Sequence, residues 1–178
     1  MIKRLVALGA LALAFTAPTA GAQRSSHRDS GGPIELGIDG GITFGLNNPT
    51  FTLIQLPVQS FRLGYFLNDR WEIEPRISLT SASGGGATVT AYSFGAGLLY
   101  QPNGDRVGKG LYFRPFVAVN GVNVPGPGDD NSGEVGIGVG LKLPFADRRL
   151  ATRLETNFSH SSGSNLLGLL FGLSWFTR

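Results

Sequence analysis

The chain has 178 residues, no cysteine and a formal net charge of +3. The lack of cysteine excludes a disulfide scaffold, and the length suits one domain. No basic cluster with interleaved aromatic residues points to a nucleic-acid partner.

The first 22 residues have the pattern of a secretory signal peptide. Lys3 and Arg4 precede an apolar run from Leu5 to Phe15, and Ala20-Gly21-Ala22 fits the small-residue cleavage pattern. The apolar run is too short to cross a bilayer as a helix. Cleavage after Ala22 would leave 13 basic against 12 acidic residues, because Lys3 and Arg4 are removed. We therefore expect an exported, nearly neutral mature chain.

Residues 23–33 are polar and rich in glycine and serine, which predicts a disordered lead-in before a domain over 34–178. Eight segments follow in which large apolar residues alternate with small or polar ones, as in strands. They centre on residues 34–46, 53–67, 71–80, 92–100, 111–120, 135–143, 150–158 and 166–175. The first half of the second segment, "LIQLPVQ", breaks the alternation and indicates a bulge. Most segments reach the length of roughly ten residues that a tilted membrane-spanning strand needs.

Ten charged residues lie within these segments, all on the small-residue parity. They are Glu35, Asp39, Arg62, Glu72, Glu74, Arg76, Arg114, Lys142, Arg153 and Glu155. The two signs are equally represented, so the side chains can pair. Alternation alone allows two arrangements: a soluble barrel with the charges outside, or an outer-membrane barrel with the charges inside.

Side-chain volume decides between these arrangements. The interior of an eight-stranded barrel is just wide enough for side chains, and the bulky parity, with Trp71, Phe94 and Trp175 among many others, would overpack it. We therefore predict an all-β protein: an eight-stranded antiparallel up-and-down transmembrane β-barrel with short periplasmic turns. The paired charges are expected to plug the lumen, so that it is not a wide pore. A soluble periplasmic ligand-binding β-barrel is the less favoured alternative.

The connections between the segments alternate in type. Asp69, Asp105 and Asp147 each precede an arginine in three of them, which we assign to the periplasmic side. The other four, "NNPT", "SGGG", "NVPGPGDDNSG" and "SHSSGSN", are assigned to outward loops. A periplasmic-side aromatic girdle is expected from Tyr65, Trp71, Tyr100, Phe145 and Trp175.

In its pattern of strands and connections, the chain resembles the small outer-membrane β-barrel proteins of the OmpA/OmpX type. The resemblance rests on the strand count, the alternation, "GYFLNDRWEIEPRI" around the first short turn, and the aromatic last strand. It implies an outer-membrane location, contact with outer-membrane lipid and lipopolysaccharide, and a structural or surface-interaction role for a monomer. It also implies recognition of the last strand by the barrel-assembly machinery, although Trp175-Phe176 is followed here by Thr177 and Arg178.

One stretch, "FSHSSGSN", could carry chemistry. His160 and Ser162 are similar to the His and Ser of the lipid A deacylases, in which a serine activated by histidine attacks an acyl group. This chain has Gly163 where that family has asparagine, and no acidic residue follows Glu155. We therefore expect no enzymatic activity and keep a deacylase-like acyl hydrolase as the alternative. No cofactor or metal is expected, because His27, the one other histidine, lies in the lead-in.

Overall fold

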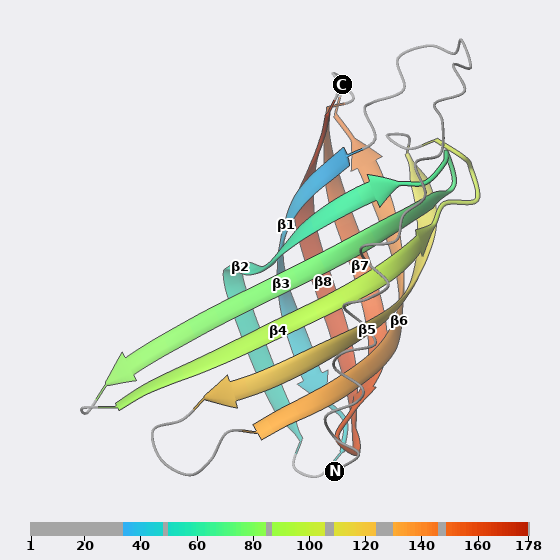
Figure 1. Ribbon diagram of the computed structural model, residues 1–178. Helices are drawn as coiled ribbons and strands as arrows, with labels where there is room; N and C mark the ends of the chain where they lie inside the picture. Colours follow the sequence, from blue (N-terminus) through green and yellow to red (C-terminus); the bar gives the residue numbers. More distant parts are fainter. Residues whose placement is uncertain are drawn as a thin grey trace.

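The computed structural model describes residues 34–47, 50–84, 87–105, 109–123, 130–145 and 149–177. The expected signal peptide and lead-in, residues 1–33, lie outside them. Eight strands make up the fold (Figure 1). They are β1 (Ile34–Gly45), β2 (Phe51–Phe66), β3 (Trp71–Gly84), β4 (Ala87–Tyr100), β5 (Gly110–Asn123), β6 (Asp130–Pro144), β7 (Leu150–Ser161) and β8 (Ser164–Phe176). Among these residues, no helix is long and apolar enough to cross a membrane.

Each strand pairs antiparallel with the next, and β8 returns to pair with β1, so the sheet closes. The predicted all-β, up-and-down, eight-stranded barrel is therefore confirmed. At the closing seam the Thr177 backbone N–H donates to the Ile34 carbonyl (2.9 Å). The Thr177 hydroxyl lies 3.2 Å from the same carbonyl oxygen and 3.3 Å from the Ile34 nitrogen. These contacts join the end of the last strand to the start of the first.

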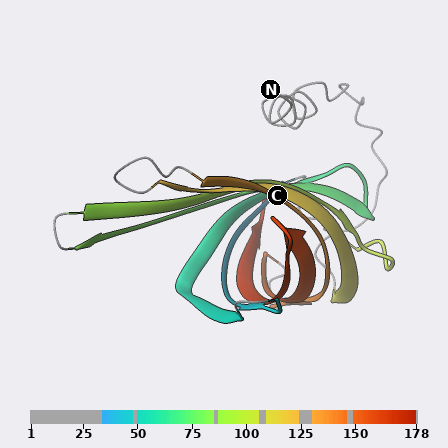
Figure 2. The same ribbon diagram turned by 90° about the horizontal axis from the view of Figure 1, so that it is seen from below.

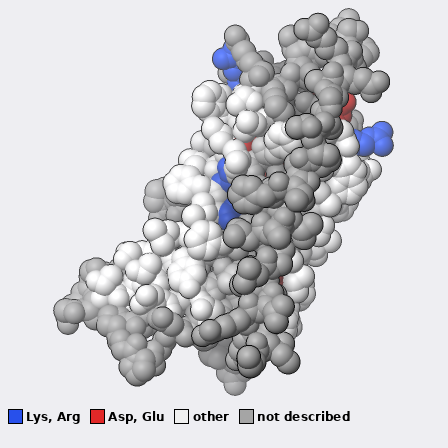
Figure 3. All heavy atoms as spheres, viewed as in Figure 1, with Lys and Arg blue, Asp and Glu red and all other residues white. Residues whose placement is uncertain are grey.

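The period-two pattern sets which side chains face outward. On β8, Leu169, Phe171 and Trp175 are exposed, whereas Leu170 and Ser174 between them are buried. The same holds around the barrel, and the described part of the wall in Figure 3 is almost uncharged. The large apolar side chains thus form an outward belt, which is the reverse of a soluble barrel with an apolar interior.

Glycines on the inward face leave room for long polar side chains. A Cβ on Gly138 would lie 2.6 Å from Oε1 of Glu155, and one on Gly64 would collide with the Glu72 carboxylate. Some bulky residues also point inward. Phe66 and Phe176 are buried beside Ala151 at the end where the chain closes, and Tyr112 is buried deeper in the lumen. The interior is therefore filled by charged and aromatic side chains, which pack against inward-facing glycine residues.

Some connections are shorter than expected, and β6 already begins at Asp130, within the loop expected over 123–133. Three connections, those that follow β2, β4 and β6, lie at the same end of the barrel as Ile34 and Thr177. Asp69-Arg70 is described, whereas Arg106, Asp147 and Arg148 of the other two expected Asp-Arg pairs lie outside the described residues. The loop expected over 159–165 is wrong, because β7 continues to Ser161 and β8 begins at Ser164. Only Ser162 and Gly163 form the turn, with φ of 48° and 82°. Positive φ at both positions suits a tight hairpin whose twist matches its strands.

The wall is regular except around β2. Opposite β1, the register moves from Asp39↔Ser60 to Gly41↔Gln55, which confirms the irregularity expected in "LIQLPVQ". Opposite β3, pairing spans only Phe61–Phe66 with Glu72–Ile77. Beyond Ile77 the strand continues to Gly84 paired with β4 alone, and the β3–β4 hairpin reaches sideways from the barrel (Figure 2). We call the half of the barrel on the hairpin side of Ile77 the outer half, and the opposite half the short-turn half.

Candidate functional site

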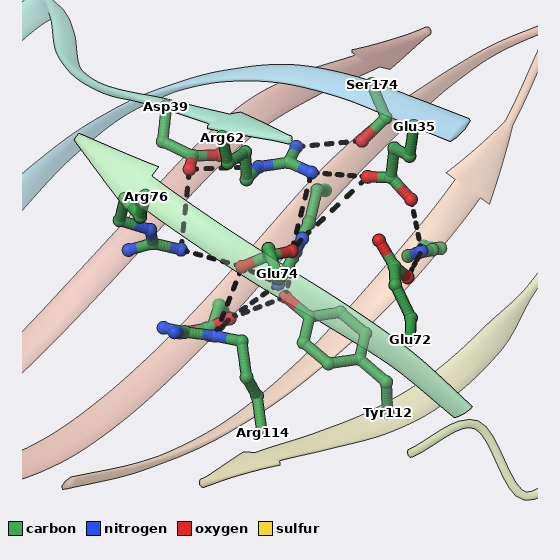
Figure 4. Close-up of polar contacts among 12 residues, drawn as sticks. Glu35, Asp39, Arg62, Glu72, Glu74, Arg76, Tyr112, Arg114 and Ser174 are labelled. Carbon is green, nitrogen blue, oxygen red and sulfur yellow. Dashed lines mark hydrogen bonds and ion pairs between the residues drawn. The ribbon is translucent and has the colours of Figure 1, made fainter. Parts of the chain in front are cut away.

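The ten charged side chains singled out in the sequence all point into the lumen. They come from six strands: β1, β2, β3, β5, β6 and β7. Nine of them belong to residues that are 0–5 % exposed, and only the Arg76 side chain, at 19 %, is more open. Figure 4 shows them gathered in one connected network. Alternation places them on one face of the sheet, and closure of the barrel brings that face together.

Lys142 anchors the network in the short-turn half. Its ammonium group donates to Glu35 (2.5 Å) and Glu72 (3.0 Å). It also lies over the rings of Phe66 and Phe176, at 5.1 and 5.4 Å from their centroids. A buried ammonium group needs both charge compensation and hydrogen-bond acceptors, and these neighbours supply them. The two phenylalanines close the lumen beneath it.

Arg62 and Arg153 hold the centre. The Arg62 guanidinium pairs with Glu35 through Nη1. Its Nε lies 3.0 Å from both carboxylate oxygens of Asp39. It also donates to the Ser174 hydroxyl at 2.8 Å. Arg153 pairs with Glu74 through Nη1. Each cation thus has at least one carboxylate partner, as burial requires.

Arg153 and Arg114 share the carboxylate of Glu155. Arg114 binds it with two nitrogens, Nε at 3.0 Å and Nη2 at 2.5 Å, in the forked geometry that arginine favours. Arg153 Nη2 lies 3.2 Å from the same group. Tyr112 joins these residues, because its hydroxyl donates to Glu155 (2.9 Å) and accepts from Arg153 Nε (2.6 Å).

Arg76 forms the outward edge of the network. Its Nη2 lies 3.3 Å from Oε1 of Glu74 and 3.5 Å from Oδ2 of Asp39. Arg114 Nε lies 3.7 Å from the same Glu74 oxygen. Glu74 therefore links Arg76, Arg114 and Arg153, and it is the most connected acid of the site.

Sequence reasoning missed the neutral members of the network. Tyr112 and Ser174 lie on the same parity as the charges, and that parity is the signal that could have identified them. The pairing itself could not be read, since Arg153 and Glu74 are 79 positions apart. Only the register of the closed sheet brings them together.

Three carboxylates, those of Glu35, Glu72 and Glu74, lie close enough to hold a cation, with one oxygen from each within 4.8 Å of the others. Lys142 contacts two of them, and Arg153 pairs with Glu74. The negative charge of the three carboxylates is therefore compensated by Lys142 and Arg153. A metal ion there would have to displace a buried ammonium group.

His160 and Ser162 are not assembled as a catalytic pair. His160 is exposed on β7, and its Nδ1 lies 2.9 Å from Oδ1 of Asn165. Ser162 occupies the tight turn, and no hydrogen bond joins it to His160 among the described residues. Glu155 points into the lumen, where Arg114 and Tyr112 bind it. The histidine therefore lacks the acidic orienting group that such a nucleophile arrangement normally contains.

The five aromatic residues expected to form a girdle all lie at the short-turn end. Tyr65, Trp71, Phe145 and Trp175 are exposed, and Tyr100 is half-exposed. Trp71 packs against Tyr100 with ring centroids 4.6 Å apart. This depth corresponds to one edge of the outward apolar belt.

Comparison with solved structures finds close matches in fold. Neisserial surface protein A superposes with a TM-score of 0.59 at 14 % identity, over 81 % of this chain and 97 % of that one. Ail, the attachment invasion locus protein of Yersinia pestis, gives 0.51 at 12 % identity, over 80 % and 97 %. The fold is that of the small eight-stranded outer-membrane β-barrels. No protein-family model and no curated protein matches the sequence.

Proposed function

We propose that the protein is an integral outer-membrane barrel with a closed lumen and a structural or surface-interaction role. The observation that carries the proposal is the pairing of an apolar outer wall with a buried network of balanced charges. Lipid and lipopolysaccharide would be its surroundings, and it would act as a monomer without a nucleic-acid partner or cofactor.

The membrane location rests on what the wall exposes. Phe61 is 58 % exposed, Ile137 51 % and Trp175 52 %, and they belong to a belt that continues around the barrel. A patch of that extent in water would drive aggregation, whereas in a bilayer it is the expected lipid-facing surface. Cell fractionation tests this, with gel mobility compared before and after boiling. Recovery in the soluble fraction with no heat-dependent mobility would contradict the proposal.

Closure of the lumen rests on the network. Five cations and five anions fill the section between Lys142 and Arg76, with Phe66 and Phe176 below them. Reconstitution into planar bilayers tests closure, and we expect no steady open state. Large, steady single-channel currents from the wild-type protein would contradict it. Buried ion pairs are weak grounds for added stability, so the proposal concerns filling of the lumen.

Assembly would depend on the last strand. Trp175 faces outward and Phe176 packs inside against Phe66, with ring centroids 6.3 Å apart. We propose that the barrel-assembly machinery recognises this aromatic strand. A Trp175→Ser variant tests the role of the outward side chain, because it leaves Phe176 in the core. Insertion in cells should fall while refolding in detergent is retained, and a loss of both would indicate a purely structural role.

An acyl hydrolase at His160 and Ser162 is the alternative that this arrangement disfavours. We expect no release of fatty acid from lipopolysaccharide by the folded wild-type protein. Release by the wild type that is lost in Ser162→Ala, with the barrel still folded, would establish the enzyme instead. The soluble ligand-binding barrel is disfavoured for a different reason, since its interior would have to be apolar and this one is charged.

A further inference from the structure

A cavity of about 290 Å³ lies in the outer half of the barrel, directly on the outward edge of the network. Arg76 and Arg114 line it on the network side. Ser78, Ser93, Asn120 and Ser159 are among the residues that line it farther out. This volume is at the small end of the range for ligand pockets, so it suits a small polar group.

Arg76 is the least compensated cation of the network. Both of its carboxylate contacts use Nη2, whereas its Nε is buried and has no hydrogen-bond partner among the described residues. Both carboxylates also bind another cation. Asp39 binds Arg62 at 3.0 Å, and Glu74 pairs with Arg153. The Arg76 side chain is nevertheless 19 % exposed and lines the cavity, so an acceptor in the cavity would add a hydrogen bond to this guanidinium.

Arg114 adds a second positive group to the same place. Figure 4 shows the Arg76 and Arg114 guanidinium groups at one end of the network, on either side of Glu74. Each has a nitrogen within 3.7 Å of the same Glu74 oxygen. Both arginines line the cavity on its network side, although Arg114 is already paired with Glu155.

The remaining lining mixes apolar residues, among them Phe51, Leu53 and Phe116, with hydrogen-bond donors and one acidic residue. The serine hydroxyls and the Asn157 side chain can donate hydrogen bonds. Glu134 also lines the cavity, but its Oε2 accepts from the Asn120 amide at 2.6 Å. The Glu134 carboxylate is therefore partly compensated by this hydrogen bond.

The described pairing between β2 and β3 ends beside this cavity. The last β2–β3 pairs, Arg62↔Arg76 and Phe61↔Ile77, lie level with the two arginines that line it. Beyond them β3 pairs with β4 alone. A group carried by a membrane lipid could approach through this break.

We propose that Arg76, assisted by Arg114, binds a phosphate-type oxyanion in the outer cavity, either as the free ion or as a group on a lipid. The oxyanion accepts from the part of the Arg76 side chain that is open to the cavity, in the plane of the guanidinium, the geometry in which arginine binds such groups. The serine hydroxyls of the cavity donate to its remaining oxygens. The site does not depend on whether the lumen conducts.

Calorimetric titration with inorganic phosphate tests the proposal, with the full mature chain in micelles of a non-ionic detergent that carries no phosphate. We expect one saturable site. Arg76→Gln should weaken it by about tenfold or more, because a hydrogen bond to a charged group is lost. Arg76→Lys, which keeps the charge but loses the planar guanidinium, should weaken it less. Arg70→Gln, the same change at an exposed arginine in the short-turn half, should leave it unchanged.

A second variant protects the test against misfolding. Ser93→Met fills the cavity without removing any member of the network, so it should abolish binding while heat-dependent gel mobility is retained. Absence of saturable binding by the folded wild type would overturn the proposal. Equal affinity in the wild type, Arg76→Gln and Ser93→Met would also overturn it, since the ion would then bind elsewhere.

Micelles of the same detergent mixed with phosphatidic acid identify the source of the oxyanion. If the head group occupies the site, the apparent affinity of the wild type for phosphate should fall in these mixed micelles, which would support the proposal for a lipid-borne group. Unchanged affinity would support it for the free ion.

Discussion

The short-turn half and the outer half of the barrel use the same alternating strands but are closed in different ways. In the short-turn half all eight neighbouring strands pair, and Lys142, Phe66 and Phe176 fill the lumen. In the outer half β2 and β3 separate, and a cavity replaces the packed network. The contrast shows that the packed part of the lumen lies in one half, whereas the other half contains a cavity.

The largest effect should come from the centre of the network. Glu74→Gln removes the carboxylate that Arg62, Arg76, Arg114 and Arg153 all approach. Breaking such a buried cluster leaves charges uncompensated, and we expect unfolding in lipid vesicles to become about 3–5 kcal/mol easier by urea titration. Glu134→Gln in the outer half is the matched control, expected to change stability by less than about 1 kcal/mol. Similar losses in the two variants would contradict the comparison.

A charge on the lipid-facing wall should come next. Val139 is exposed on β6 opposite Phe113, within the belt. Val139→Arg should make folding into bilayers less favourable by about 2–4 kcal/mol, and Val139→Leu should leave the folding free energy nearly unchanged. Val89→Arg, in the projecting β3–β4 hairpin, should have an effect of less than about 1 kcal/mol. If Arg and Leu are tolerated equally at position 139, the outward assignment is wrong.

Overfilling the lumen should have a moderate effect. A Cβ at Gly138 would lie 2.6 Å from the Glu155 carboxylate, which Arg114 and Tyr112 hold in place. Gly138→Leu should therefore reduce stability by about 1–3 kcal/mol or prevent folding, as judged by gel mobility before and after boiling. A Cβ added at Gly133 in the outer half would meet no atom within 4 Å, so Gly133→Leu should fold like the wild type. Normal folding of Gly138→Leu would show that the lumen has spare room.

The smallest effect should be at the β7–β8 turn. Ser162 has a positive φ of 48° directly before Gly163. Asparagine tolerates this conformation better than serine, and Asn-Gly is a favoured pair for such turns. Ser162→Asn should raise stability by less than about 1 kcal/mol in urea titration. Any marked loss would mean that the serine hydroxyl has a structural partner in the membrane-embedded protein.

Much of the fold could be predicted because alternation and side-chain volume together allow one arrangement of the strands for this chain. On β8 the contrast between Phe171 and Gly172 suffices to orient the strand, and volume then decides which face is inside. The parity of the ten charges follows from the same rule. What alternation cannot reveal is register, so the pairing of Arg153 with Glu74 could not be predicted.

Two features were beyond the sequence for physical reasons. The separation of β2 from β3 leaves the alternation of β3 intact, because Ser78 and Leu79 still alternate while pairing with β4. The turn at Ser162 was predicted as a longer loop, since serine and glycine around His160 suit a loop as well as a small-residue strand face. In both cases local composition is compatible with more than one set of long-range partners.

The seam between β1 and β8 has a kinetic consequence. The hydrogen bonds between Thr177 and Ile34 join positions 143 apart in the sequence. Until β8 is synthesised, β1 keeps an open edge with unpaired backbone groups, which a bilayer core does not tolerate. Closure is therefore a long-range event that cannot proceed residue by residue from the ribosome. The chain must therefore remain unfolded until the first and last strands can pair with each other.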